Sequence, residues 1–253
     1  MAGHSKWANI RHRKDRQDKK RSKIWSKCSR AIITAARNGG PDPDTNLTLR
    51  YAIDEAKYAN MPKDTIQRAV DKGAGSGQGD SFEEVVYEGY GPAGTAIIID
   101  TLTDNKNRTV TEIRMLFKKS GGSMGNAGSV SYLFQTKGRV IVKADAMEDE
   151  ALMDAALEAG AEDVELPEAD AEERIATVLT DVGDFQGVKE ALEAAGLEVI
   201  EAEIAKIPEN TVAVVGDDAR KAMTLIDGLE DSDDVQKVYS NADIPDDVLA
   251  ELG

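Results

Sequence analysis

The chain has 253 residues, a hydrophobic content of 41% and a net charge of −16. This length and apolar content are sufficient for more than one hydrophobic core. No run of about 18 apolar residues is present, which argues against a membrane helix, and the single cysteine, Cys28, excludes an intrachain disulfide. The start of the chain is basic and lacks the apolar stretch of a secretory signal. We therefore expect a cytoplasmic protein with no membrane partner.

The charge is distributed unevenly along the chain. Residues 1–72 hold 17 Lys and Arg against 8 Asp and Glu, a net charge of +9, whereas the remainder holds 14 against 39, a net charge of −25. The positive excess is densest in residues 1–37, where Asp15 and Asp18 are the only acids. Clustered positive charge is repulsive unless a polyanion relieves it. The asymmetry predicts a polyanion-binding N-terminal segment on an acidic body.

The first predicted helix covers about residues 15–37. Its apolar residues recur at helical spacing and form one stripe, and Cys28 lies on that stripe, where we expect a small buried residue. Basic side chains cluster beside the stripe and are expected to point to solvent; they are Lys23, Lys27, Arg30 and Arg37. The sequence Asn-Gly-Gly-Pro at residues 38–41 ends the helix.

Two further helices and a linker complete the N-terminal part. The second helix is predicted from near Pro43 or Asp44 to the Asn-Met-Pro sequence at residues 60–62. The third is predicted from Pro62 to Lys72, with proline in its first turn. Residues 73–79 alternate glycine with small or polar residues. That composition is typical of a flexible linker and predicts a domain boundary.

After the linker, the pattern changes to mixed strands and helices. Strands are predicted over residues 84–90 and 95–103, followed by a helix over residues 108–119. A glycine-rich loop at residues 121–128 then leads into a strand over residues 130–135. This piece has the order strand, strand, helix, strand.

The next segment follows the order of a ferredoxin-like motif. Strand, helix, strand, strand, helix and strand are predicted in turn over residues 139–143, 149–159, 163–166, 175–180, 184–195 and 198–205. A last strand, helix and strand, predicted over residues 212–215, 217–229 and 235–239, complete the earlier piece.

The predicted fold class is therefore α+β. An N-terminal three-helix domain is followed by two ferredoxin-like-type α/β domains, the last of which is discontinuous around the middle one. The predicted domains are a basic helical nucleic-acid-binding domain with its linker (1–79), a discontinuous α+β domain (80–136 with 206–253) and an inserted ferredoxin-like domain (137–205).

The stretch from Gly3 to Lys14 pairs a lone aromatic residue with clustered cations. Lys and Arg neutralise phosphates and release counterions. Trp7 either stacks on an unpaired base or packs into the helical core, and both interpretations stay open. The candidate nucleic-acid-binding residues are Lys6, Trp7, Arg11, Arg13, Lys14, Arg16, Lys19, Lys20, Arg21, Lys23, Lys27 and Arg30.

The same stretch resembles the start of the YebC/PmpR proteins. The resemblance continues through Lys-Lys-Arg at 19–21, Asn-Met-Pro at 60–62, Tyr-Glu-Gly-Tyr-Gly-Pro at 87–92, Thr-Asp-Asn-Lys-Asn-Arg-Thr at 103–109, and residues 121–130 and 231–239. These segments lie in order along nearly the whole chain, which makes the match specific. The resemblance implies a helical domain and two interleaved α/β domains. It also implies a role in gene expression.

Two roles are described for that family, and both stay open. One is a probable DNA-binding regulator of transcription. The other is a ribosome-associated translation factor that binds ribosomal RNA and relieves stalling at proline-rich stretches. Asn9, Arg11 and Arg13 could reach base edges, but no convincing helix–turn–helix is present, and lysine-rich helices also suit structured RNA. We expect a monomer whose partner is DNA or ribosomal RNA, in the second case on the ribosome.

No catalytic, metal or cofactor site is predicted. His4 and His12 both lie in the basic arm, at a spacing that fits no common zinc site. The loop at residues 121–128 follows a helix and precedes a strand, so a mobile contact loop or a plain connection is favoured over a nucleotide site. Asn107 is expected to cap the following helix, and the acidic run at residues 230–234 is expected to be solvated surface. We therefore expect a protein that is not an enzyme.

Overall fold

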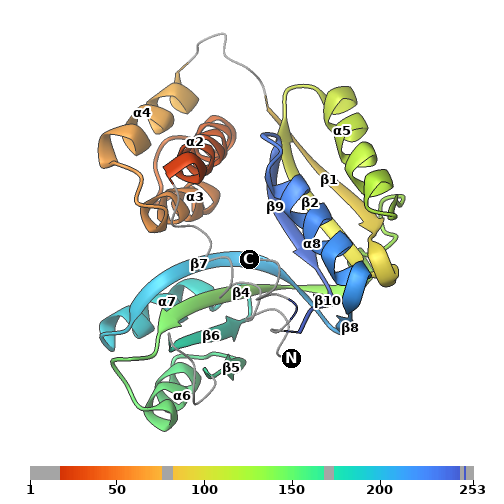
Figure 1. The fold of residues 1–253 in the computed structure, drawn as a ribbon. Helices are drawn as coiled ribbons and strands as arrows, with labels where there is room; N and C mark the ends of the chain where they lie inside the picture. The colour runs from red at the N-terminus through yellow and green to blue at the C-terminus, as the bar shows by residue number, and fades with distance from the viewer. Residues whose placement is uncertain (1–17, 76–81, 168–173, 246–247, 249–253) are drawn as a thin grey trace.

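The computed structural model describes residues 18–75, 82–167, 174–245 and Val248, with only the backbone for residues 18–20. N-terminal helices are followed by two antiparallel four-stranded sheets with helices packed on them (Figure 1). This arrangement confirms the predicted α+β class. Within the described residues, no helix has the length and apolar character needed to cross a membrane.

The N-terminal helices are α2 (Asp18–Gly39), α3 (Leu47–Tyr58) and α4 (Lys63–Ala74). Helix α2 ends where the Gly-Gly-Pro sequence predicts, and Gly40 adopts a φ of +89° that glycine reaches without strain. The side chain of Asn46 caps α3 by accepting a hydrogen bond from the backbone N–H of Leu49. Cys28 is buried in the core between the helices, as predicted.

Gly73 lies inside α4, so its assignment to the flexible linker is wrong. It is buried against α2, and a Cβ at this position would lie 2.5 Å from the carbonyl oxygen of Ile33 and 2.7 Å from the Cβ of Ala36. Glycine is therefore needed for two helices to approach closely, rather than for chain flexibility. The predicted linker at residues 76–79 lies outside the described residues.

The first sheet joins segments that are far apart in the sequence. Its strand order is β3-β1-β2-β9, and each neighbouring pair is antiparallel. Helices α5 and α8 pack on one face, around a core that includes Ile97, Phe117 and Leu225 (Figure 1). The elements are β1 (Glu83–Tyr90), β2 (Ala96–Thr103), α5 (Lys106–Lys119), β3 (Ser123–Met124), α8 (Gly216–Glu230) and β9 (Val235–Ser240).

The second sheet has the ferredoxin-like order that the sequence predicts. Its strands are arranged β5-β6-β4-β7, all antiparallel, and the core includes Val140, Phe185 and Leu192. The elements are β4 (Phe134–Lys143), α6 (Asp149–Glu158), β5 (Asp163–Glu165), β6 (Ile175–Thr180), α7 (Phe185–Ala194) and β7 (Glu198–Pro208).

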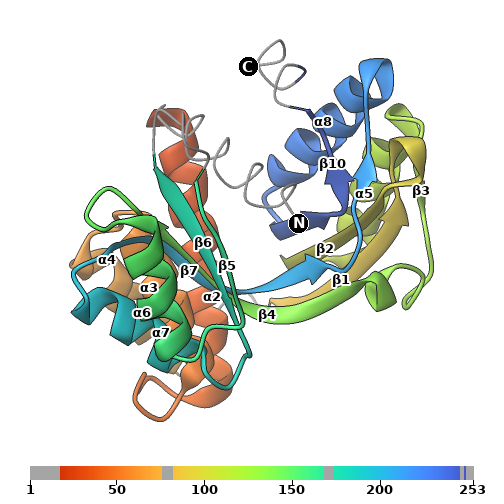
Figure 2. The same ribbon diagram turned by 90° about the horizontal axis from the view of Figure 1, so that it is seen from below.

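Strands β4 and β7 are longer than predicted and connect the two sheet regions (Figure 2). They pair antiparallel from Phe134 and Pro208 at one end to Lys143 and Glu198 at the other. The strand predicted at residues 130–135 is instead the short 3-10 helix η2 (Ser131–Leu133) followed by the start of β4. The predicted domain limits therefore fall inside β4 and β7, and the division into three domains stays a prediction.

The strand predicted at residues 212–215 does not join the first sheet. Residues Val212–Ala213 form β8, which pairs in parallel with β10 (Ala242–Asp243) as a separate two-stranded sheet. The fourth position of the first sheet belongs to β3, from the glycine-rich loop. This part of the predicted topology is wrong because a local pattern identifies a strand without its pairing partner.

Candidate nucleic-acid interface

The structure describes only part of the predicted nucleic-acid-binding set. The N-terminal candidates Lys6, Trp7, Arg11, Arg13, Lys14 and Arg16 lie outside the described residues. The backbones of Lys19 and Lys20 lie in α2, and their side chains are not described. The side chains that the structure describes are those of Arg21, Lys23, Lys27 and Arg30, all on α2. The geometry of the predicted interface is therefore defined by these four side chains.

The basic face of α2, defined here as Lys23, Lys27 and Arg30, repeats at intervals of four and three residues. Side chains at that spacing lie one above another along a helix. All three contact the acidic segment, defined here as residues 230–234, which joins the end of α8 to the start of β9. The expectation that the cations point to solvent is therefore wrong for Lys27 and Arg30, which are half-buried, whereas Lys23 is exposed as predicted although it also contacts the segment.

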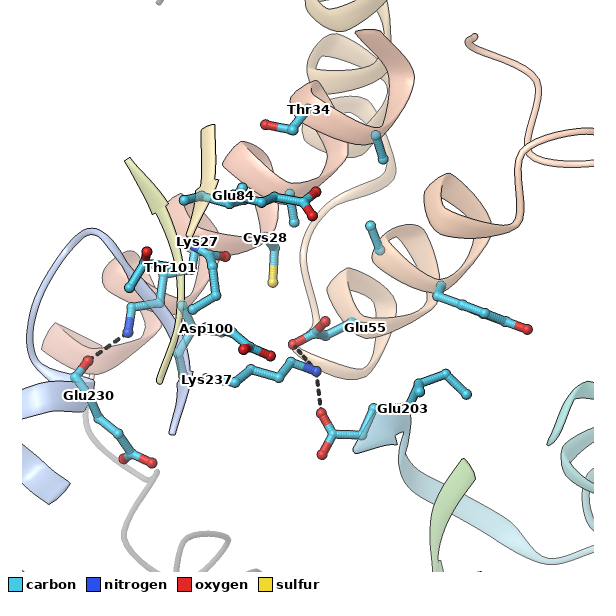
Figure 3. Close-up of a pocket in the computed structure, with 18 of the residues that line it drawn as sticks. Lys27, Cys28, Thr34, Glu55, Glu84, Asp100, Thr101, Glu203, Glu230 and Lys237 are labelled. Atoms are coloured by element: carbon cyan, nitrogen blue, oxygen red, sulfur yellow. Dashed lines mark hydrogen bonds and ion pairs between the residues drawn. The ribbon is translucent and has the colours of Figure 1, made fainter. Parts of the chain in front are cut away.

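Each cation donates to oxygens of the acidic segment. The Nζ of Lys23 lies 2.9 Å from the carbonyl oxygen of Asp231 and 3.2 Å from its Oδ1. The Nζ of Lys27 donates to the carbonyl oxygen of Glu230 at 2.6 Å (Figure 3). Arg30 donates to the carbonyl oxygen of Asp233 at 2.7 Å and to Oδ1 of Asp234 at 3.2 Å. The acceptors are main-chain carbonyls as well as carboxylates.

Helix electrostatics explain this contact. The last carbonyls of a helix lack partners within it and carry partial negative charge. The acidic segment adds carboxylates at the C-terminal end of α8, where they are unfavourable unless cations compensate them. That conflict was a signal in the sequence that the segment needs a basic partner. The prediction of a fully solvated acidic run is wrong, since Ser232 and Asp234 are both 4% exposed.

Within the acidic segment, Asp234 is held in place by several hydrogen bonds. Its Oδ2 accepts from the guanidinium of Arg108 at 2.6 Å and from the hydroxyls of Thr109 and Thr103 at 2.7 and 3.2 Å. Burial raises the pKa of Asp234, but the hydrogen bonds from Arg108 and Thr109 outweigh burial and hold that pKa below its usual value. The carboxylate is therefore held ionised, with Oδ1 directed at Arg30.

The same geometry explains the Thr-Asp-Asn-Lys-Asn-Arg-Thr stretch at residues 103–109. The sequence predicts a helix cap at Asn107, with Lys106 and Arg108 as candidates for a binding face. The cap of α5 is Asn105, whose side chain accepts from the backbone N–H of Arg108 at 3.1 Å. Arg108 and Thr109 then project from the first turn to Asp234. Sequence reasoning missed this contact because the partner lies about 125 positions away.

Helix α3 makes a second, different contact with the rest of the protein. The ring of Tyr51 packs edge-on against Phe185 of α7, with ring centroids 5.3 Å apart. Asp54 and the buried Lys189 form an ion pair at 2.6 Å. Burial lowers the pKa of Lys189, but the hydrogen bond and charge of Asp54 outweigh it and raise that pKa overall. This contact combines an aromatic pair with a largely buried ion pair.

A cavity of about 760 Å³ lies between α2, α3 and strands β2, β7 and β9 (Figure 3). Inside it, Lys237 pairs with Glu203 and, at 3.3 Å, with Glu55, while Lys206 pairs with Asp100. Burial lowers the pKa of Lys237, but the charges of the two glutamates raise it well above its usual value. Because carboxylates already neutralise both lysines, neither offers an unpaired charge to a phosphate.

The glycine-rich loop at residues 121–128 is anchored by Glu88. One carboxylate oxygen of Glu88 accepts from the backbone N–H of Gly128 at 2.8 Å, and the other accepts from Val130 and Ser131 at 2.7 and 2.9 Å. A phosphate loop needs such backbone donors for its ligand. Here a carboxylate of the protein accepts from the donors at the end of the loop and just after it. Among the residues described, no group of three or more His, Cys, Asp and Glu is arranged to hold a metal.

Comparisons with known proteins agree over the whole chain. Residues 5–76 match the family model described as the TACO1/YebC protein N-terminal domain, and residues 82–242 match the TACO1/YebC second and third domain. The transcriptional regulatory protein PmpR of Pseudomonas aeruginosa is 53% identical over 253 residues, the full length of both chains. A probable transcriptional regulatory protein of Dictyoglomus thermophilum is 49% identical over the same length, again all of both chains.

A solved structure is also similar. The crystal structure of a conserved hypothetical protein from Aquifex aeolicus has a TM-score of 0.81 and 45% sequence identity, and the match covers 90% of this chain and 92% of that chain. Family models, full-length relatives and fold therefore confirm the resemblance drawn from the sequence motifs. The chain belongs to the TACO1/YebC family.

Proposed function

We propose that this protein is a nucleic-acid-binding regulator of gene expression that contacts the phosphate backbone through its basic N-terminal segment. The observation that carries the proposal is the charge division: +9 over residues 1–72 against −25 over the remainder. Such a segment neutralises phosphates and releases counterions. The names of the relatives, which are transcriptional regulatory proteins, support the same role.

Helix α2 supplies one part of the proposed interface and the arm before it supplies the other. Lys23, Lys27 and Arg30 lie on one face of α2, and Arg21 is exposed near its start. A row of cations along a helix follows a phosphate backbone without reading base sequence. Target selection would then depend on the arm, where Trp7 and Arg11 offer stacking and base-edge contacts.

The direct test replaces the cations at the start of α2. Changing Lys19, Lys20 and Arg21 to Gln is expected to weaken binding of a labelled 30-base-pair DNA duplex about tenfold or more in 0.1 M salt. The slope of log K against log salt concentration should fall by about three, since each lost phosphate contact removes roughly 0.9. Fluorescence anisotropy over a salt series measures both quantities.

A matched control comes from α4. Changing Lys63, Arg68 and Lys72 to Gln removes the same charge from the same group of helices, and all three residues are exposed. The control is expected to keep most of the affinity and a slope near the wild-type value. Equal losses in both variants would mean that only net charge matters. No loss in either would refute the proposed interface.

The nature of the nucleic acid needs a separate experiment. We propose duplex DNA, following the transcriptional names of the relatives. Lysate is sedimented through a sucrose gradient, with RNase-treated and high-salt controls, and the protein is then detected by blotting. A regulator of transcription should stay at the top of the gradient and be retained on duplex DNA at physiological salt. Co-migration with ribosomal particles, lost in high salt, would overturn the DNA assignment in favour of ribosomal RNA.

We further propose that the protein acts by binding rather than by catalysis, as a cytoplasmic monomer. The regulatory names of the relatives support a binding role. Sedimentation equilibrium of the purified chain tests the monomer, because a dimer would have twice the mass of 27.2 kDa. Cell fractionation tests the location.

A further inference from the structure

The basic face of α2 already has an internal partner. We propose that the acidic segment at residues 230–234 masks this face, so that nucleic acid binds it only by displacing the segment. The proposal rests on the proposed function and adds a regulatory contact to the same site. It makes Lys23, Lys27 and Arg30 shared between two alternative partners, one within the chain and one outside it.

The segment presents the chemistry that a phosphate backbone would present. Its acceptors are anionic or partly negative oxygens, and they lie 2.6–3.2 Å from the three cations. Cations bind phosphate oxygens with the same geometry. A cation that donates to Asp231 or Asp234 has fewer N–H groups left to donate to a phosphate oxygen. The two partners therefore compete for the same donors.

The contact is exposed enough to be reversible. The side chains of Lys23 and Asp231 are 46% and 73% exposed, and an exposed ion pair of this kind contributes little to stability. The pair of Arg30 with Asp234 is more buried, with side chains 22% and 5% exposed. Beyond the ion pairs, the guanidinium of Arg30 lies over the ring of Phe82, 5.2 Å from its centre. The contact of α3 instead includes the aromatic pair of Tyr51 with Phe185 and an ion pair to Lys189, whose side chain is 8% exposed. The α2 contact is therefore the weaker of the two.

The acidic segment does not need α2 to keep its shape. Arg108, Thr109 and Thr103 hold Asp234 from the other side, and the backbone N–H of Leu102 donates to the carbonyl oxygen of Asp234 at 2.8 Å. Displacing α2 leaves these bonds in place. The segment is thus a preformed acceptor to which α2 returns when nucleic acid leaves.

The test neutralises the segment while keeping Asp234, which supports the fold. Glu230→Gln, Asp231→Asn and Asp233→Asn together should tighten binding of the 30-base-pair DNA duplex about three- to tenfold in 0.1 M salt, given the small free energy of exposed pairs. The matched control removes the same charge from α6, which lies away from α2 (Figure 1). It consists of Glu150→Gln, Asp154→Asn and Glu158→Gln, and should change the affinity less than twofold.

A double-variant cycle separates masking from a general charge effect. Lys23→Gln, Lys27→Gln and Arg30→Gln together remove the masked cations, so adding the three segment changes to this background should have almost no further effect. The same gain in both backgrounds would overturn the masking proposal. If the wild type binds and the segment variant binds equally, masking is refuted and the proposed function stands. If none of the proteins binds the duplex, the proposed function fails, and masking with it.

Discussion

Asp234→Ala is expected to lower the free energy of unfolding by about 2–4 kcal/mol. The carboxylate is 4% exposed, and it accepts from the hydroxyls of Thr109 and Thr103, which are 0% and 1% exposed. Alanine removes the charged acceptor of these hydroxyls, and a hydrogen bond to a charged group contributes about 1.5–3 kcal/mol. The hydroxyl of Thr109 keeps the carbonyl oxygen of Asn105 as an acceptor, at 3.1 Å. The side chain of Arg108 is 50% exposed, so water replaces most of its lost bond.

Urea unfolding followed by circular dichroism measures this loss. The slope of the unfolding free energy against urea concentration should be the same as in the wild type. The comparison is Asp231→Ala, because that carboxylate is 73% exposed and should cost less than about 1 kcal/mol. Asp234→Asn should fall between the two, since it keeps the shape and one acceptor oxygen. The reasoning is refuted if the free energy of unfolding of Asp234→Ala lies within about 1 kcal/mol of the wild-type value. It is also refuted if Asp231→Ala lowers that free energy as much as Asp234→Ala does.

Three further predictions concern packing, ion pairing and pH. Gly73→Ala should lower the urea midpoint, because its Cβ would lie 2.5 Å from the carbonyl oxygen of Ile33 and overpacking costs about 1–3 kcal/mol; a midpoint at or above the wild-type value would contradict the close packing. Asp54→Ala should lower the free energy of unfolding by about 3 kcal/mol, because it removes the ion-pair partner of buried Lys189. The double variant Asp54→Leu with Lys189→Met should recover most of that loss in urea unfolding. Equal losses in the single and double variants would contradict the prediction. Burial raises the pKa of Glu88, but three backbone hydrogen bonds outweigh it and hold that pKa below 4.5. Its stabilisation is therefore present above pH 4.5 and lost as the pH falls through the folded-state pKa. In Glu88→Gln the urea midpoint should fall less steeply with decreasing pH than in the wild type. Parallel plots of urea midpoint against pH for the two proteins would contradict this prediction.

Local patterns predicted most elements of the fold. The strand at Ile175–Thr180 and the ferredoxin-like order around it followed from apolar runs between turn residues. The errors arise where a contact across the chain decides the outcome. Gly73 continues a helix because α2 packs on it. Residues 134–143 form one strand because Pro208 and its neighbours in β7 pair along it.

The candidate site was predicted in part for the same reason. Clustering of Lys and Arg in the sequence identifies the basic face of α2 without any knowledge of the fold. Its internal partner lies more than 200 residues away, and no periodicity connects Lys23 to Asp231. The role of Arg108 was likewise hidden, because a residue in the first turn of a helix has an ordinary local explanation.

The placement of β9 beside β2 has a consequence for the order in which the protein is made. Strand β2 contains three consecutive buried isoleucines, Ile97 to Ile99, and its second edge is covered only when residues 235–240 arrive. At about 5–20 residues per second, a ribosome needs on the order of ten seconds to make the intervening chain. During that interval an apolar strand has an open edge, the feature that promotes pairing between chains. The second sheet, between β4 and β7, is made in this interval. The newly made chain is therefore most prone to aggregation before residues 235–240 emerge, and an early stop in translation near residue 230 would release it in that state.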